Sequence, residues 1–323
     1  MSTLANTLQT LSLDFGNFEL KSFDGRQVNR IRSIQLPLAG GQKALKATEK
    51  SPVVELDGQR WHVGTQAARY PQQSQATVQG DKVKLAQLHL AACIAHSGSY
   101  RLIVSHHSTD DYGSFLRSTL LGEHSYHRNG QPLLVSVSSV QIIDEGRGAY
   151  ELAKQQGYVP QRGYTVVIDL GGSTWTSSVY AADGELIDHS PHERQGTFAL
   201  AGAIAKDERL HKPLLEQFSI TSPDPVVIQD GFTAGHYYQE SNICWADWLA
   251  EYLDPWWAGI VATLKSQYQQ HLPKVKRFLI TGGGAHLISH KVAASPIFLV
   301  CPDAPTANVR GGFYLSQSSL VAA

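Results

Sequence analysis

Two short segments of this 323-residue sequence carry the same set of chemically useful residues. Residues 14–21 (DFGNFELK) place Asp14 at the end of an apolar run, a glycine turn after it, and Lys21 on the return. A glycine turn lets backbone N–H groups approach an anion closely, because no Cβ intervenes. A lysine can reach a terminal phosphate, and an aspartate can hold hydrated Mg²⁺ through its waters. Residues 169–174 (DLGGST) supply similar parts, so the pair predicts phosphate and Mg²⁺ binding.

A third glycine-rich segment follows the apolar residues 278–281 (FLIT) and consists of Gly282, Gly283 and Gly284. Three consecutive glycines leave room for a flat, bulky group to lie against the backbone, and the N-terminus of a following helix favours phosphate. A tight strand-to-helix turn alone would need one glycine, so we interpret this segment as part of the same site.

An acidic pair ends an apolar run in residues 142–149 (IIDEGRGA). Glu145 in this position could orient an attacking water, either by accepting its proton or by hydrogen bonding to it. The alternative is that Asp144 or Glu145 caps the helix that follows. The local sequence leaves both interpretations open.

The elements that position these residues repeat. Alternating patterns and glycine turns predict strands in the first half, and apolar spacing predicts helices, the first of them with Asp81 as N-cap. The expected strands are 10–16, 18–23, 28–38, 52–57, 60–64, 101–105 and a hairpin over 122–143; the expected helices are 81–97, 110–121 and 147–157, with a polar loop at 40–51. The order restarts with a strand at 164–169, a return strand through Tyr180 and a turn at 183–184.

This repeat predicts an α/β protein made of two duplicated lobes. We expect the first lobe to span residues 1–160, joined by a C-terminal helix at 310–323, and the second to span 161–309. Each lobe begins with one of the two Asp-x-Gly turns. An Asp-x-Gly turn alone is more often a plain hairpin, but two at the starts of duplicated halves favour a shared function.

Composition narrows the class of protein further. The formal charge of -1 argues against charge-driven binding to DNA or to an acidic membrane. Three scattered cysteines form no CxxC pair and fit buried thiols in a reducing cytosol. Residues 1–16 lack the pattern of a signal peptide, and no apolar run is long enough to span a bilayer. We therefore expect a cytoplasmic protein that contacts neither nucleic acid nor membrane directly.

These motifs occur along the whole chain in an order that resembles the actin/hexokinase/heat-shock-chaperone ATPase superfamily. Residues 14–21, 142–149, 169–174 and 281–285 look like its first phosphate, connecting, second phosphate and adenosine motifs. The size and the segment 307–313 (ANVRGGF) are similar to bacterial actin-like proteins of the ParM/StbA plasmid-segregation type.

The resemblance implies duplicated ribonuclease-H-like lobes with a cleft for Mg-ATP or Mg-ADP. By it, Asp14 and Asp169 would organise Mg²⁺ through water, Asp169 also counting as catalytic, and Glu145 would position the attacking water. The nucleotide would contact Asp14, Gly16, Asn17, Lys21, Asp169, Gly171, Gly172, Ser173, Thr174, Gly282, Gly283 and Gly284. ATP would favour a head-to-tail homopolymer filament, which would carry plasmid DNA through a DNA-binding adaptor protein.

One position departs from the family pattern. Similar proteins often carry an aspartate where this chain has Thr176, two residues after Thr174. The change motivates the hypothesis of slow hydrolysis and long-lived filaments. A small-molecule kinase or a non-polymerising regulatory ATPase of the same superfamily remains the alternative function.

The histidine pairs and an aromatic run are interpreted as structural rather than functional features. The 14 histidines include three close pairs, but no Cys, Asp or Glu recurs beside them at ligand spacing, so we expect no metal site there. Aromatic residues at 245, 248, 252, 256 and 257 follow helical spacing, which predicts a packed helix face more readily than an interface.

Overall fold

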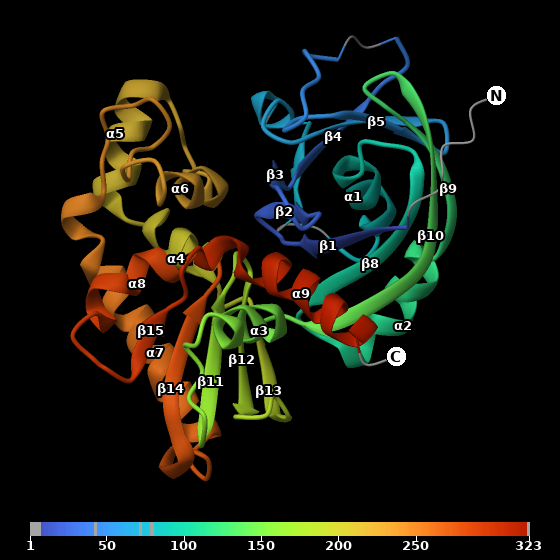
Figure 1. Cartoon of the computed structure of the whole chain (residues 1–323). Helices are drawn as coiled ribbons and strands as arrows, with labels where there is room; N and C mark the ends of the chain where they lie inside the picture. The colour runs from blue at the N-terminus through green and yellow to red at the C-terminus, as the bar shows by residue number, and fades with distance from the viewer. Residues whose placement is uncertain (1–7, 42–43, 71–72, 78–80, 322–323) are drawn as a thin grey trace. The chain divides into compact units, whose positions relative to one another are not determined.

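The computed structural model describes residues 8–41, 44–70, 73–77 and 81–321, and the chain divides into two compact units. Unit 1 comprises Met1–Val159 with Cys301–Ala323, and unit 2 comprises Pro160–Val300 (Figure 1). Residues 301–309 therefore belong to unit 1, although the sequence placed them in the second lobe. Each unit is described by itself.

Unit 1 is built on one curved sheet. Its strand order is β3-β2-β1-β8-β10-β9-β5-β6-β4-β7. In chain order the strands are β1 (Gln9–Phe15), β2 (Glu19–Phe23), β3 (Val28–Arg32), β4 (Ile34–Leu38), β5 (Val53–Leu56), β6 (Gln59–Val63), β7 (Gln75–Ala76), β8 (Gly98–His106), β9 (Gly122–Arg128) and β10 (Gln131–Asp144). β8 is parallel to both β1 and β10, so these three strands end at the same edge of the sheet.

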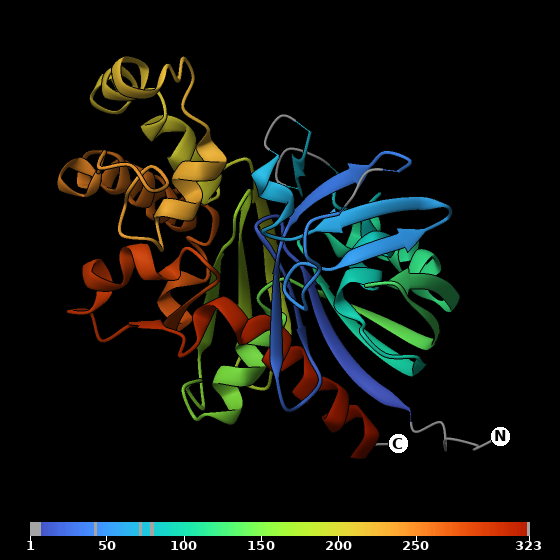
Figure 2. The same cartoon turned by 90° about the horizontal axis from the view of Figure 1, so that it is seen from above.

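Four α-helices in the described part of unit 1 cover this sheet: α1 (Ala86–Cys93), α2 (Thr109–Leu120), α3 (Arg147–Gln155) and α9 (Ala307–Val321). The 3-10 turns η1 (Ala67–Arg69) and η5 (Ala304–Thr306) also belong to unit 1. The curved sheet and α1 share one apolar core, to which Leu116 and Leu120 of α2 also belong. Figure 2 shows the strands of unit 1, in blue to green, from above. α9 runs along β1, β2 and β8 and packs against α3.

Glycines make the contact between α3 and α9 unusually close. A Cβ on Gly148 would lie 2.1 Å from the carbonyl oxygen of Asn308, and one on Gly311 would lie 1.6 Å from the carbonyl oxygen of Gly148. Real Cβ atoms do not approach backbone this closely. The two helices therefore touch backbone to backbone, which only glycine allows at these positions.

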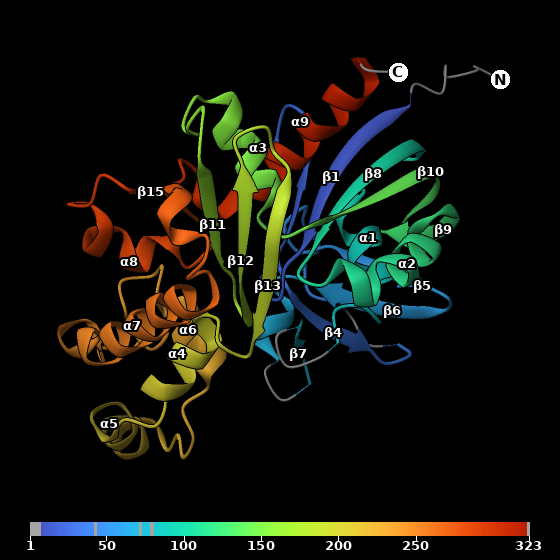
Figure 3. The same ribbon diagram turned by 90° about the horizontal axis from the view of Figure 1, so that it is seen from below.

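Unit 2 has a sheet in the order β13-β12-β11-β14-β15, of which Figure 3 shows β11, β12 and β13 side by side. The strands are β11 (Tyr164–Leu170), β12 (Thr174–Ala181), β13 (Leu186–Glu193), β14 (Val275–Thr281) and β15 (Phe298–Val300). The helices are α4 (Thr197–Ile204), α5 (Glu208–Phe218), α6 (Pro225–Gly231), α7 (Ala250–Gln267) and α8 (Ala285–Val292), with 3-10 turns η3 (Ala246–Trp248) and η4 (Leu272–Lys274).

The two sheets repeat one order of strands. In each, three antiparallel strands lie in reverse chain order (β3-β2-β1 and β13-β12-β11), and two parallel strands follow (β8-β10 and β14-β15). The predicted duplication of an α/β lobe is thus confirmed. Both units place an aspartate, Asp14 or Asp169, at the end of the first strand.

Three predictions about elements need correction. The strand expected at 28–38 is two strands, because Ser33 leaves the ladder and hydrogen-bonds Thr77 through its side chain. The helix expected at 81–97 is only α1, and the carboxylate of Asp81 accepts from the N–H groups of Val83 and Lys84 in a turn before it. The aromatic residues do not share one α-helix, since Trp245 and Trp248 precede α7.

No helix in the described ranges is long and apolar enough to cross a bilayer. The three cysteines are free thiols, with Cys93 and Cys301 buried.

Candidate functional site

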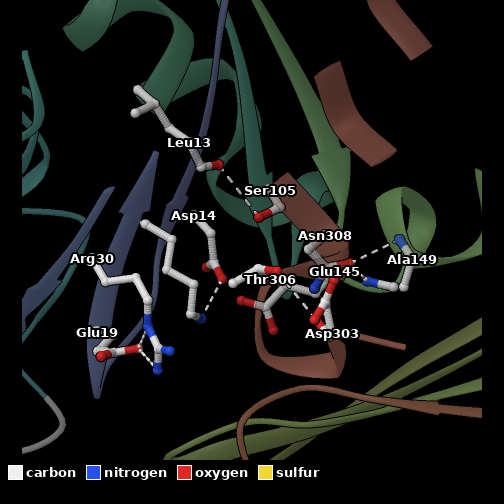
Figure 4. Close-up of polar contacts among 12 residues, drawn as sticks. Leu13, Asp14, Glu19, Arg30, Ser105, Glu145, Ala149, Asp303, Thr306 and Asn308 are labelled. Carbon is white, nitrogen blue, oxygen red and sulfur yellow. Dashed lines mark hydrogen bonds and ion pairs between the residues drawn. The ribbon is translucent and has the colours of Figure 1, made fainter. Parts of the chain in front are cut away.

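The shared edge of β1, β8 and β10 gathers polar side chains in unit 1. Asp14 is in register with Ser105, and Asp144 is in register with His106. The N–H of Glu145 donates to the carbonyl oxygen of His106 at 3.0 Å. Figure 4 shows Asp14, Ser105 and Glu145 at this edge. Parallel strands expose their carboxyl ends together, so residues far apart in sequence meet here.

The first glycine turn lies at the start of this edge. Gly16 and Asn17 connect β1 to β2, and a Cβ on Gly16 would lie 2.5 Å from the carbonyl oxygen of Glu19. Lys21 returns on β2 opposite Asp14, and its Nζ donates to Asp14 Oδ2 at 2.9 Å. Both side chains are largely buried. The sequence assigned Asp14 to Mg²⁺ and Lys21 to phosphate, and in this structure the two groups neutralise each other.

Glu145 has a partner that no motif indicated. Lys82 Nζ, 63 residues earlier in the chain, donates to Glu145 Oε1 at 3.1 Å, and the two side chains are 7% and 13% exposed. Burial alone would raise the pKa of Glu145, but the charge of Lys82, with smaller effects from His107 and His106, lowers it to about 2. Burial also lowers the pKa of His106 to about 3, and nearby Lys82 adds to this effect. Glu145 is therefore a carboxylate beside a neutral His106 ring.

The helix-capping interpretation of the acidic pair is not what the structure shows. α3 begins after Gly146, which has φ +90° and makes no side-chain cap. Instead, Asn308 Oδ1 of α9 accepts from the N–H groups of Gly146 and Ala149, at 3.1 and 3.2 Å (Figure 4). Asp144 accepts from Thr109 Oγ1 at 2.6 Å. Asn308 thus fixes the turn directly after Glu145.

The second glycine turn in unit 2 is held by the N-terminus of α4. The N–H groups of Thr197, Phe198 and Gly196 donate to the carbonyl oxygens of Gly171, Gly172 and Ser173, respectively. A Cβ on Gly196 would lie 2.5 Å from the Gly172 oxygen, so a glycine is required there. All three carbonyls of the turn therefore point toward α4, and no hydrogen bond within the described part of the chain uses the N–H of Gly172.

The third glycine segment lies beside this turn. Asp169 of β11 is in register with Thr281 of β14, and the N–H of Gly284 donates to the carbonyl oxygen of Leu170 at 2.8 Å. Gly282 has φ +87°, and a Cβ there would lie 2.2 Å from Asp169 Oδ1. Gly283 differs, because a Cβ on it would meet no atom within 4 Å.

Further side chains tie these loops together. Gln229 of α6 donates to Thr197 Oγ1 at 2.7 Å, and its Oε1 is buried without a hydrogen-bond partner among the described residues. The two ring nitrogens of His286 contact the carbonyl oxygens of Gly283 and Phe232, at 2.8 and 3.1 Å. Unit 2 thus brings together all of its sequence-predicted site residues, which are Asp169, Gly171, Gly172, Ser173, Thr174, Gly282, Gly283 and Gly284.

Thr176 lies directly opposite Asp169 on β12. Its side chain is buried, and Oγ1 has no hydrogen-bond partner in the described ranges. The threonine that replaces the usual aspartate is therefore a buried neighbour of Asp169 rather than a surface residue.

These features fit a phosphate-containing ligand with a hydrated cation. The Gly172 N–H can donate to an anion, Gly283 leaves space against the backbone, and single carboxylates suit a cation held through water. Among the described residues no group of three or more His, Cys, Asp or Glu could hold a metal ion directly.

The sequence missed Lys82, Asn308, Gly196 and Gln229 because each acts through a partner distant in the chain. The only local signal was the glycine immediately before α4, at a position where many residues can cap a helix.

The two repeated α/β units have the actin-like fold. Residues 12–148 match the family described as "Actin like proteins N terminal domain". This match and the solved structures below show the actin-like fold, and the predicted resemblance to the ParM type is confirmed at the level of the fold.

Solved structures agree over nearly the whole chain. Ta0583, an archaeal actin homolog, has a TM-score of 0.74 at 17% identity, covering 96% of this chain and 100% of its own. Its complex with ADP gives 0.75 at 15% identity, with 96% and 100% covered. A 15-stranded ParM filament from Clostridium botulinum gives 0.76 at 12% identity, with 97% and 99% covered. No curated protein matches the sequence.

Proposed function

We propose that the chain binds ATP with Mg²⁺, hydrolyses it, and polymerises into filaments in the cytoplasm. The observation that carries the nucleotide part is the loop cluster of unit 2, where Asp169, the turn held by α4 and the three glycines meet. The ADP complex of the archaeal homolog supports it, since that protein shares the fold.

We assign the proposed roles within each unit in turn. In unit 2, Gly171, Gly172, Ser173 and Thr174 bind phosphate, Asp169 holds Mg²⁺ through water, and Gly282, Gly283 and Gly284 lie against the nucleoside. In unit 1, Gly16, Asn17 and Lys21 bind phosphate, Asp14 holds Mg²⁺ through water, and Glu145 orients the attacking water. Mg²⁺, when bound, neutralises charge on the phosphate oxygens.

On binding, Lys21 and Asp14 exchange their mutual ion pair for these new partners. In the nucleotide-free protein the ion pair gives each of these largely buried groups a partner of opposite charge. This proposal explains why a lysine and an aspartate face each other across one hairpin.

The filament part rests on the relatives. One of the structures with this fold is itself a ParM filament, and repeated head-to-tail contacts between identical subunits give an open helical polymer. We propose that the filament segregates plasmid DNA through a DNA-binding adaptor protein. The formal charge of -1 favours such indirect attachment over direct DNA contact.

Right-angle light scattering tests polymerisation, with Mg²⁺ and ATP, with ADP, and without nucleotide, checked by negative-stain electron microscopy. We expect scattering to rise with ATP and filaments to be visible. A flat trace with tight ATP binding would instead favour the kinase or regulatory alternative, and no binding of ATP at all would refute the nucleotide site.

Phosphate release measures the consequence of Thr176. We expect steady-state release to be slow, because the position opposite Asp169 carries no second carboxylate. Rates comparable with those of brisk ATPases would refute this part of the proposal.

A further inference from the structure

Lys82 is a buried lysine whose ammonium group donates a hydrogen bond to Glu145. Lysines are rarely buried unless they are paired, and this side chain is 7% exposed. Its partner is Oε1 of Glu145, the residue to which we assign the attacking water. No sequence motif marks Lys82, since it lies in the turn before α1 rather than on the strands that carry the site.

We infer that Lys82 is a positioning residue for hydrolysis: its ammonium group fixes Glu145 through Oε1 and directs Oε2 of the same carboxylate to the attacking water. This inference rests on the proposed function, because it assumes that Glu145 faces the water. It adds to that function a second residue, which acts through Glu145 and does not touch the nucleotide.

The local fold holds Lys82 in place. The carboxylate of Asp81 accepts from the N–H groups of Val83 and Lys84, at 3.0 and 3.4 Å, so the turn that carries Lys82 is closed by its own hydrogen bonds. At the other side of the pair, the N–H of Glu145 donates to His106 and the following N–H donates to Asn308. Both ends of the ion pair are therefore attached to ordered backbone.

Charge balance explains why the lysine is needed. The ionisable groups that act on Glu145 are Lys82, His107 and His106. Burial keeps His106 neutral, so Lys82 is the fixed positive charge, and His107 contributes only when protonated. Without Lys82, burial would favour the protonated acid, because the charged form loses its hydration. A protonated Glu145 cannot offer both carboxylate oxygens as acceptors.

The same balance favours one of the two possible roles of Glu145. Lys82 lowers the pKa of Glu145 below its usual range, which makes this carboxylate a weaker base than an ordinary glutamate and less suited to remove a proton from water. A carboxylate with one oxygen bound by Lys82 can still accept a hydrogen bond from water with the other. Lys82 therefore makes Glu145 an orienting group.

The test compares Lys82→Met with Lys84→Met, which removes the same charge two residues away. Lys84 is a matched control because its side chain is 82% exposed and pairs, among the described residues, with the partly exposed Asp81 at 3.5 Å. Lys82→Arg keeps the positive charge, and Glu145→Gln identifies the signal of the carboxyl group. The readouts are the pH dependence of kcat, the Kd for Mg-ATP, and the infrared band of the protonated carboxyl in nucleotide-free protein.

We expect Lys82→Met to acquire an acid limb in the neutral range, with kcat at pH 6 at least tenfold below that of Lys84→Met and recovery at higher pH. The ionised fraction of Glu145 falls about tenfold when its pKa lies one unit above the assay pH, and burial without a paired charge can raise a carboxyl pKa by about 3–5 units. The Kd for Mg-ATP should change less than about twofold, because Lys82 does not touch the nucleotide, and Lys82→Arg should restore most of the rate. A pH profile of Lys82→Met that coincides with that of Lys84→Met would overturn the inference.

The infrared measurement keeps the inference separate from the proposed function and from folding. The band removed by Glu145→Gln should be absent in the wild-type protein at pH 6 and present in Lys82→Met. If Lys82→Met fails to fold, the wild-type titration decides, and a protonated Glu145 at pH 6 overturns the inference. If the wild-type protein binds no ATP, the proposed function fails, while the infrared result still shows whether Lys82 sets the charge of Glu145.

Discussion

Replacing Gly311 with alanine should separate α9 from α3 and loosen the turn that follows Glu145. The added Cβ would lie 1.6 Å from the carbonyl oxygen of Gly148, and neither backbone can give way without moving its helix. Moving α9 also lengthens the two hydrogen bonds that Asn308 accepts from Gly146 and Ala149.

The expected loss in the free energy of unfolding combines the steric cost, the lost hydrogen bonds and the gain in helix propensity. Forcing extra volume into a packed contact costs about 1–3 kcal/mol. Each lost hydrogen bond costs about 0.5–1.5 kcal/mol, and the better helix propensity of alanine returns about 0.5–1 kcal/mol. We expect a net loss of about 1–5 kcal/mol in the free energy of unfolding of unit 1, which is roughly fivefold to a few thousand-fold in the opening equilibrium.

Hydrogen exchange read by mass spectrometry localises the effect, because it resolves α3 and α9 from the helices of unit 2. The matched control is Gly259→Ala in α7, where a Cβ would meet no atom within 4 Å. That variant should gain about 0.5–1 kcal/mol through helix propensity alone. If Gly311→Ala leaves the exchange of α3 and α9 as slow as in the control, the backbone contact between these helices is not as described.

The remaining predictions concern the loops and the buried groups. Gly282→Ala should lower nucleotide affinity more than tenfold in calorimetry, because its Cβ would displace the carboxylate of Asp169. Gly283→Ala should keep the thermal stability of the protein and still weaken nucleotide binding. Equal affinities for both variants and the wild type would contradict the nucleoside contact. Asp169→Ala should abolish the Mg²⁺-dependent part of nucleotide affinity, and titrations with and without Mg²⁺ that coincide in the wild type would contradict this. Glu145→Ala should bind ATP normally, release phosphate at least tenfold more slowly and lengthen filament lifetime; phosphate release at the wild-type rate would assign the water to another residue. His89 is fully buried, neither of its ring nitrogens has a partner among the described residues, and burial lowers its pKa to about 3. Since the pKa of His89 in the unfolded chain is about 6.5, the free energy of unfolding should fall as pH falls from about 6.5 towards 3. His89→Leu should raise the free energy of unfolding in urea by about 1–3 kcal/mol and reduce this loss at acid pH. If the wild type and His89→Leu lose the same free energy of unfolding between pH 7.5 and pH 5, this prediction is wrong.

Local patterns in the sequence were sufficient for the hairpins and for the grouping of the candidate site residues of unit 2. The glycine turns after Asp14 and Asp169 are strand-to-strand connections as predicted, because glycine and the flanking alternation act within a few residues. The cluster of Asp169, the second turn and the three glycines was also foreseeable, since parallel strands end at one edge.

Contacts between distant residues could not be read in this way. Ser33 breaks the strand expected at 28–38 because its partner, Thr77, lies 44 residues away. Lys82 looked like one polar residue of a helix, whereas it reaches Glu145 across 63 residues. In both cases a hydrogen bond to a residue distant in the sequence determines the local structure, and the periodicity of the neighbouring residues does not indicate that partner.

The position of Asn308 has a consequence for the order of synthesis on the ribosome. The backbone groups of Gly146 and Ala149 receive their acceptor only after about 160 further residues have been translated, and those residues include the whole of unit 2. Unit 2 is continuous in sequence, so it can complete its fold on the nascent chain while unit 1 still lacks its last helix. The turn beside Glu145 is therefore among the last parts of the protein to become ordered, and the newly made chain gains it only once α9 has left the exit tunnel.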